Sequence, residues 1–263
     1  MTAVFKHELK LNLKSLFIWA LSVGGMGFAC ILLYTSMEGE MAEMADTFSN
    51  MGAFSDAFGM STLSIATING FFATEVGTVH GLGSAMFAAI MAAVLLSKEE
   101  DAHTGEFLYS LPVSRGKIVL AKGLSLLAEL VIFNVICGAL YVCGYVALDE
   151  AIPQKELAVL LLRMLLMNAE IAAVALIVSA CSAKNRIGLG LGMALMFYAY
   201  DLIGRVVPDM KDYLFFGPFS VSNASEIFSG KETPVAGLTT SAVIILISCA
   251  TAYYIYMKKD LAS

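Results

Sequence analysis

Charged residues are scarce in this sequence. Asp, Glu, Lys and Arg make up 14% of its 263 residues, whereas soluble domains carry about 25%. Hydrophobic residues make up 59%, and the mean hydropathy is +0.79. A soluble fold of this length could not bury so much apolar surface, so the composition indicates a protein that resides in a lipid bilayer. The formal net charge of −6 gives no support for a nucleic-acid partner.

The sequence also lacks the motifs of enzymes and metal sites. It has no GxxxxGK[ST] loop, and the Gly-Lys of the segment SGKET lacks the upstream glycine that such a nucleotide-binding loop needs. Neither HExxH, nor a Ser-His-Asp arrangement, nor a cluster of metal ligands occurs. The five cysteines fall inside apolar runs and none forms CxxC, so we expect neither a disulfide nor a metal site. We therefore expect that the chain is not an enzyme and binds no cofactor of its own.

Long apolar runs, in contrast, are abundant. Six of them are long enough to cross a bilayer, which takes about 20 residues. Their approximate bounds are 16–34, 79–97, 124–148, 157–183, 187–207 and 236–257. The runs are continuously apolar, which favours helices over a β-barrel. The sequence thus predicts an all-α polytopic membrane protein, with residues 1–263 in one transmembrane domain and the first run retained as a span.

Basic residues are distributed unevenly between these runs. The loop 35–78 contains acidic residues but no Lys or Arg. Most Lys and Arg residues precede the first run, separate the second from the third and the fourth from the fifth, or follow the sixth. By the positive-inside rule, these segments and both termini face the cytoplasm.

Two flanking segments have helical patterns of their own. In residues 1–15, Lys6, Lys10 and Lys14 are interspersed with leucines, which predicts a short amphipathic helix in the cytoplasmic membrane interface. In the outer loop 35–78, Met and Phe residues recur every three or four positions, which predicts a helix. This second helix would either cover the outer mouth of a pathway or pack on the outer ends of the spans.

The segment 98–123, between the second and third runs, is unusually rich in charge. Pro112 divides it into two expected helices, of which Thr104 can cap the first and Ser114 the second. The first of these helices has one apolar edge, formed by Phe107, Leu108 and Leu111. A short charged helix with such an edge suits docking into a groove of a soluble partner. The alternative is an amphipathic loop that lies on the membrane.

In this segment the sequence resembles the membrane subunit of type-2 ATP-binding-cassette (ABC) exporters. In that family the loop after the second span has an acidic start, a helix with glycine and leucine, and then a proline, a small residue, an arginine and a lysine. The matching residues here are Glu99, Glu100, Gly105, Leu108, Leu111, Pro112, Ser114, Arg115 and Lys122. The basic N-terminus, the six spans and the long outer segment after the first span are also similar to that family.

The resemblance implies specific partners. A coupling helix within 98–123 would dock on an ABC ATPase that is a separate chain, and ATP and Mg²⁺ would bind to that ATPase. The docking residues would be Glu106, Phe107, Leu108, Leu111, Pro112 and Arg115. A second membrane subunit, identical or related, would complete a transporter in the bacterial cytoplasmic membrane. It would move a drug, a peptide or a lipid-like molecule out of the cell.

Four charged residues of the predicted spans are candidates for a pathway or gate: Glu129, Arg163, Glu170 and Asp201. Charged residues at this depth usually face protein or water. Arg163 and Glu170 are two turns apart and share one face of the fourth span. Asp201 lies four residues before Arg205 and can pair with it. These charges either line a pathway or gate, or pack between helices of one subunit.

Glycines cluster in the first and fifth predicted spans, where Gly24, Gly27, Gly188 and Gly192 form flat surfaces. Such surfaces let helices approach closely. The resemblance places both spans near the subunit interface. Packing within one subunit is the alternative.

Two other functions are compatible with the sequence. A membrane sensor or scaffold that only recruits a partner would also use the charged segment. A secondary transporter would need internal repeats and broken helices near the middle of the membrane, and no repeat between the two halves is evident. The exporter subunit is the function that the sequence favours.

Overall fold

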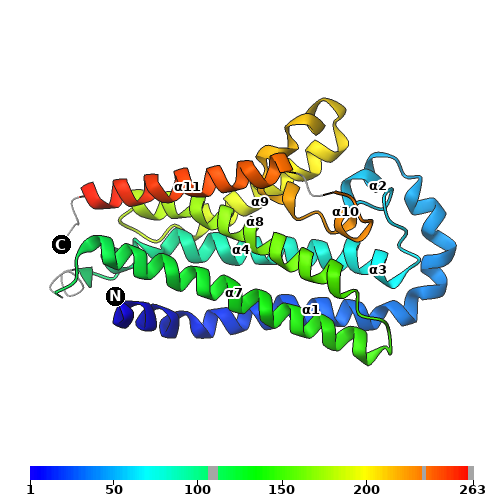
Figure 1. The fold of residues 1–263 in the computed structure, drawn as a ribbon, viewed down its shortest axis with the longest axis horizontal. Helices are drawn as coiled ribbons and strands as arrows, with labels where there is room; N and C mark the ends of the chain where they lie inside the picture. Colours follow the sequence, from blue (N-terminus) through cyan, green and yellow to red (C-terminus); the bar gives the residue numbers. More distant parts are fainter. Residues whose placement is uncertain (106–111, 233–234, 260–263) are drawn as a thin grey trace.

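The computed structural model describes residues 1–105, 112–232 and 235–259, and every regular element in these residues is a helix (Figure 1). The helices that are long and apolar enough to cross a membrane are α1 (Thr2–Ser49), the continuous series α3 (Ile68–Phe71), η1 (Phe72–Val76) and α4 (Gly77–Leu95), α7 (Arg115–Ala147), α8 (Gln154–Cys181), α9 (Ile187–Val206) and α11 (Val235–Lys258). Shorter helices connect them: α2 (Ala53–Phe58), α5 (Lys98–Asp101), η2 (Pro208–Phe216), η3 (Pro218–Val221) and α10 (Ala224–Phe228). The predicted all-α membrane protein with six spanning helices is confirmed.

Helix α1 is much longer than the predicted first span. It has 48 residues. At 1.5 Å per residue it is about 70 Å long, more than twice the hydrocarbon thickness of a bilayer. The segment 1–15, predicted as a separate amphipathic helix, forms its first turns, and the outer segment from residue 35 begins as its last turns. Residues 1–49 contain no proline, and the spacing of Met and Phe continues the helical pattern, so nothing in the sequence ends the helix early. That the first turns lie in the membrane interface stays a prediction.

The second span begins at Ile68, about three turns before the predicted start at residue 79. Its first part includes η1, a single π-helical stretch. Phe72 and Val76 are fully buried there, and the polar Thr74 is buried with them. The polar residues of this stretch differ in their surroundings, since Thr74 is buried whereas Glu75 is exposed.

The long helices run side by side along one axis (Figure 1). Both chain termini lie at the same end of this bundle, together with α5 and the start of α7, and we call it the terminal end. Helices α2, α3 and α10 lie at the opposite end, which we call the distal end. The described flanks of segment 98–123 are thus on the same side of the bundle as the two termini.

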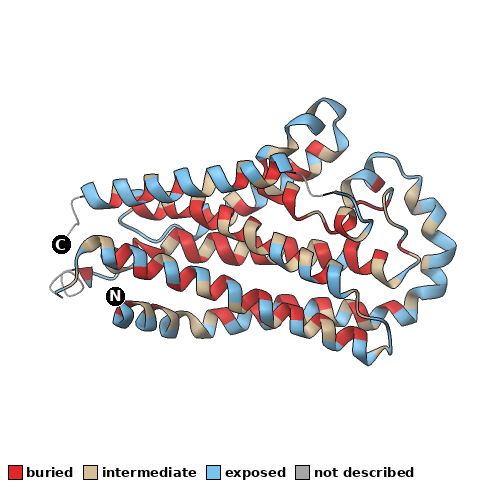
Figure 2. Ribbon diagram, viewed as in Figure 1, coloured by how far each residue is buried: buried red, intermediate tan, exposed pale blue. Residues whose placement is uncertain are grey.

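Helix α8 and the span that contains α4 form the centre of the bundle. In the most apolar part of each, 61% of the residues are buried, against 22% in α9 and α11. Helix α1 packs on α7, α9 packs on α4, and α11 packs on α8. Figure 2 shows buried residues where the helices face one another and exposed residues along the outer sides. The exposed sides of α9 and α11 are apolar, as expected for contact with lipid or with another subunit.

Candidate functional site

A network of charged side chains joins the helices at the terminal end. Its members are Glu8, Lys98, Glu99, Glu100, Lys122 and Lys259, and we call it the terminal ion network. Three of them are consecutive residues of α5, the one-turn helix that follows the second span. Each of these three pairs with a different part of the chain.

The first two residues of α5 pair with α1 and α7. Lys98 Nζ forms an ion pair with Glu8 of α1, and Glu99 forms one with Lys122 of α7. Lys122 Nζ also lies 3.4 Å from Glu8 Oε1 and donates a 2.7 Å hydrogen bond to the Leu95 carbonyl oxygen at the end of α4. The side chains of Lys122 and Glu8 are 0% and 3% exposed. Because a buried charge is costly unless it is paired, Lys122 and Glu8 each depend on their partners.

The third residue of α5 pairs with the end of α11. Glu100 Oε1 lies 2.7 Å from Nζ of Lys259, the residue directly after α11. The same Nζ donates a 2.7 Å hydrogen bond to the Ser182 carbonyl oxygen at the end of α8. Arg115, the first residue of α7, donates from Nη1 to the Lys259 carbonyl oxygen at 3.2 Å. Helices α5, α7 and α8 thus all hold the end of α11.

The predicted docking segment lies next to this network, and the structure places part of it. Four predicted docking residues lie outside the described residues: Glu106, Phe107, Leu108 and Leu111. Pro112 is exposed, and Arg115 is partly buried at the start of α7. Ser114 occupies the N-cap position of α7, although its side chain makes no capping hydrogen bond.

The intramembrane carboxyl groups of Glu129 and Glu170 are both buried between helices of the chain. Glu129 Oε1 accepts a 2.9 Å hydrogen bond from Asn12 Nδ2 of α1, and Glu170 is 2% exposed on α8, which packs on α11. These contacts favour the packing alternative for both residues. Arg163, in contrast, lines a surface cavity beside the first turn of α11.

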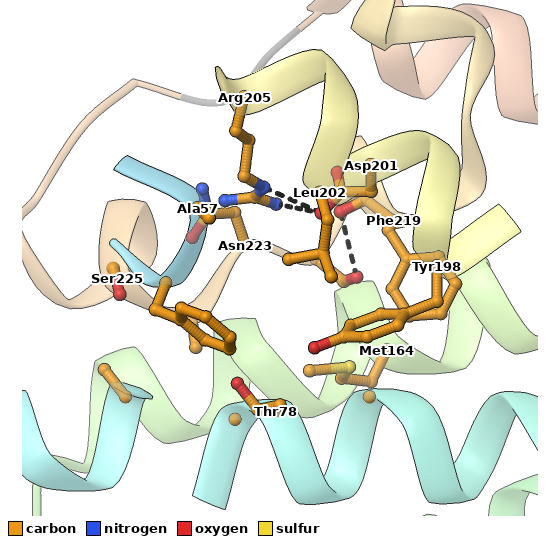
Figure 3. A pocket seen from close by; sticks show the side chains of 16 residues that line it. Ala57, Thr78, Met164, Tyr198, Asp201, Leu202, Arg205, Phe219, Asn223 and Ser225 are labelled. Carbon is orange, nitrogen blue, oxygen red and sulfur yellow. Dashed lines mark hydrogen bonds and ion pairs between the residues drawn. The ribbon is translucent and has the colours of Figure 1, made fainter. Parts of the chain in front are cut away.

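A pocket at the distal end surrounds Asp201 and Arg205 near the end of α9 (Figure 3). Arg205 Nε and Nη2 each lie 2.7 Å from Asp201 Oδ2, so the pair expected from their spacing is present. Tyr198, Met164 and Thr78 line the same pocket, which has a volume of about 50 Å³.

A larger cavity of about 440 Å³ adjoins this pocket. Asp201, Arg205 and Asn223 line both spaces. The larger cavity has four further charged residues in its lining: Asp56, Lys211, Glu226 and Lys231. The Asp201–Arg205 pair is thus part of the wall of both a small pocket and a charged cavity.

Two of the four predicted interface glycines face other helices of the same chain, and the other two face open space. A Cβ atom on Gly24 would lie 2.7 Å from Leu140 Cδ1, and one on Gly27 would contact the Tyr141 ring. Both contacts involve α7 of the same chain, which favours the intrachain alternative for these two glycines. At Gly188 and Gly192, no heavy atom of the described residues lies within 4 Å of such a Cβ atom. These two positions are open to a neighbouring molecule.

Sequence reasoning missed the partners of several buried charges. Glu8 and Asn12 were assigned no role, and Lys122 only a place in the family resemblance, yet each is a hydrogen-bonding or ion-pairing partner across helices. One signal was available for Glu8, because it is the only acidic residue among the basic residues 1–15. An acidic side chain is out of place on a surface that binds lipid headgroups, and is explained by a partner inside the protein.

A buried polar chain in the middle of the bundle was also missed. His80 of α4 is 1% exposed, and its Nδ1 lies 2.8 Å from the Tyr141 hydroxyl oxygen. Its Nε2 lies 3.0 Å from Asn134 Oδ1. The signal was the presence of His80 and Asn134 in otherwise apolar runs, since polar groups at such positions need a partner.

Comparison with known proteins assigns the chain to a family. A family model described as ABC-2 family transporter protein matches residues 2–261. A search of curated proteins finds no match. The matched range includes all the candidate spanning helices and the terminal ion network. Because the match covers nearly the whole chain, the chain belongs to the ABC-2 transporter family, as a transmembrane component and not as the ATP-binding one.

Proposed function

We propose that this chain is the transmembrane subunit of an ABC exporter and that a separate ATPase subunit drives it. The observation that carries the proposal is the position of α5 and the start of α7, which flank the predicted coupling helix at the same end of the bundle as both termini. The distribution of basic residues predicts that this end faces the cytoplasm. An ATPase that binds there would have access to cytoplasmic ATP.

The ATPase would dock on the coupling helix that the sequence predicts. Its contacts would include the apolar edge of that helix and Pro112, which is exposed. Arg115 would contribute less, because its Nη1 already donates to the Lys259 carbonyl oxygen. ATP and Mg²⁺ would bind to the ATPase and not to this chain. Closure of two ATPase subunits would then move the terminal ends of the spans as rigid bodies.

A second membrane subunit, identical or related, would pack on α9. The open surface there contains Gly188 and Gly192, and exposed apolar residues surround them: Ile187, Leu189, Leu195 and Met196. Small residues on an apolar face allow close approach between helices in a membrane. The substrate path would run between the two membrane subunits of a bacterial cytoplasmic membrane. The substrate would be a drug, a peptide or a lipid-like molecule that leaves the cell.

The proposal is tested by purifying the chain together with the ATPase that it recruits. We expect an ABC ATPase to co-purify in stoichiometric amount and its hydrolysis rate to depend on the membrane subunit. Leu111→Asp should reduce ATPase binding, because a charge on the apolar edge of the predicted helix would enter the docking groove. The chain should still insert into the membrane.

A matched control is Met51→Asp. Met51 is an apolar residue that is 49% exposed, between α1 and α2 at the distal end. This change should leave ATPase binding intact. If wild-type chain recruits no ABC ATPase, the exporter proposal is wrong. Recruitment of a partner without any effect on hydrolysis would instead support a sensor or scaffold.

A further inference from the structure

We infer that α5 is a connector that transfers movement to α1 and α7 through Lys98 and Glu99, and by a separate contact to α11 through Glu100. This inference rests on the proposed function, because it assigns positioning residues to the movement that the ATPase would drive. The three residues are consecutive, and each contacts a different helix or its end.

The geometry of a single helical turn explains how three neighbours reach three helices. Successive side chains on an α-helix point about 100° apart, so three of them cover most directions around the axis. Helix α5 has four residues, and its position between the end of α4 and the start of α7 places it among the terminal ends of the spans. Lys98 points to Glu8 of α1, and Glu99 points to Lys122 of α7.

The burial of the pairs makes these contacts more than surface ion pairs. The side chains of Glu8, Lys122 and Glu100 are 3%, 0% and 2% exposed. Separation of a buried pair leaves an uncompensated charge inside the protein, whereas separation of an exposed pair costs little because water replaces the partner. When α5 moves, its buried partners are therefore held to it and their helices move with it.

The link to α11 is the most informative of the three. Helix α11 is far from α5 in the sequence, and Lys259 lies at its very end. Glu100 is the residue of α5 that contacts it, at 2.7 Å. Loss of this pair removes the direct contact of α5 with the end of α11 and leaves the links through Lys98 and Glu99 in place. The coupling of α11 to α5 should therefore weaken, although Arg115 and Ser182 still contact Lys259.

Hydrogen–deuterium exchange of the complete complex tests the inference. The chain is purified with its co-purifying ATPase in lipid nanodiscs, and exchange is measured with and without a non-hydrolysable ATP analogue and Mg²⁺. In the wild type we expect nucleotide to change exchange at the terminal ends of α1, α7 and α11. In Glu100→Gln we expect this change to be reduced at α11 and retained at α1 and α7.

Two further variants test which residue links α5 to which helix. Lys259→Met removes the same link from the other side and should give the same reduction at α11. Lys98→Gln should instead reduce the response at α1, where Lys122 still contacts Glu8, and retain the response at α11. Lys231→Gln serves as the control, because Lys231 pairs with Glu226 at 52% and 38% side-chain exposure, away from α5. It should leave all three responses unchanged.

Each result separates the connector from its alternatives. If nucleotide changes nothing in the wild type although the ATPase is bound, the proposed function fails and the connector fails with it. If the wild type responds and Glu100→Gln responds equally at α11, the connector is wrong and the proposed function stands. If Glu100→Gln loses the response in all three helices at once, α5 holds the three helices together as one unit, and separate transfer to α11 is overturned.

Discussion

Asn12 of α1 and Glu129 of α7 meet in the interior of the bundle, where Asn12 Nδ2 donates a 2.9 Å hydrogen bond to Glu129 Oε1. Glu129 is 0% exposed, and its Oε2 has no hydrogen-bond partner among the described residues. The contact joins two helices that pack along much of their length. The carboxyl group of Glu129, a candidate for lining a pathway, therefore belongs to the interface between α1 and α7.

Changes at the two partners should therefore lower the free energy of unfolding by different amounts. Asn12→Leu removes the donor and leaves a buried carboxyl group, so we expect a loss of about 1–3 kcal/mol in the free energy of unfolding. Glu129→Gln keeps an oxygen that accepts from Asn12 and should cost less. Thermal unfolding of the purified chain in detergent measures both changes. A larger loss for Glu129→Gln than for Asn12→Leu would contradict the packing role.

Lys122 is the most deeply buried member of the terminal ion network. Lys122→Met leaves Glu99 without its partner and Glu8 with one partner fewer, so we expect a loss of about 3–5 kcal/mol in the free energy of unfolding. Lys231→Met, which breaks an exposed pair, should cost no more than about 1 kcal/mol. Both variants keep the length of the aliphatic side chain and differ in burial, so equal unfolding temperatures would contradict this account.

The spans could be predicted from the sequence because length and apolar character are local properties of the chain. The same local information misplaced their ends. Helix α1 continues to Ser49 because its outer residues keep a helical spacing after they leave the apolar run, and hydropathy alone does not show this. The second span starts at Ile68, and hydropathy did not show this because its first turns contain polar residues, of which Thr74 is buried.

The partners of the buried charges could not be predicted from one sequence. Glu8, Lys98 and Lys122 come from three helices, and only the folded bundle brings them together. The pair Asp201–Arg205 could be predicted, because a spacing of four residues places both on one face of the same helix. Whether a glycine faces its own chain or a neighbour depends on how its helix is rotated about its axis. Gly27 of α1 faces other helices of the chain, whereas Gly192 of α9 faces open space.

These two glycines should respond differently to the same substitution. A Cβ atom on Gly27 would lie 2.9 Å from Val76 Cγ1 and would also contact Tyr141, so Gly27→Leu should destabilise the folded chain by about 1–3 kcal/mol or more. Gly192 faces open space, so Gly192→Leu should leave the unfolding temperature of the chain unchanged and weaken assembly of two membrane subunits. Thermal unfolding and chemical cross-linking separate the two effects. Unchanged recovery of cross-linked dimer in Gly192→Leu would count against an interface at α9.

The pair Asp201–Arg205 should separate the small distal pocket from the charged cavity, because both residues line both spaces. A double variant, Asp201→Ala with Arg205→Ala, removes both charges together and so leaves no buried charge unpaired. We expect the two spaces to merge. A cysteine introduced by Thr78→Cys, in the lining of the small pocket, should then react several-fold faster with a membrane-impermeant thiol reagent. Mass spectrometry of the peptide that contains residue 78 distinguishes this thiol from the native cysteines.

The matched control for this experiment is Glu226→Ala with Lys231→Ala. This change removes an ion pair of similar composition that is exposed and lines the charged cavity but not the small pocket. It should leave the reactivity at residue 78 unchanged, because the wall between the two spaces is intact. If both double variants accelerate labelling equally, a general loosening of the distal end explains the result. If neither does, Asp201 and Arg205 only pack α9 against its neighbours, and they do not control access to the pocket.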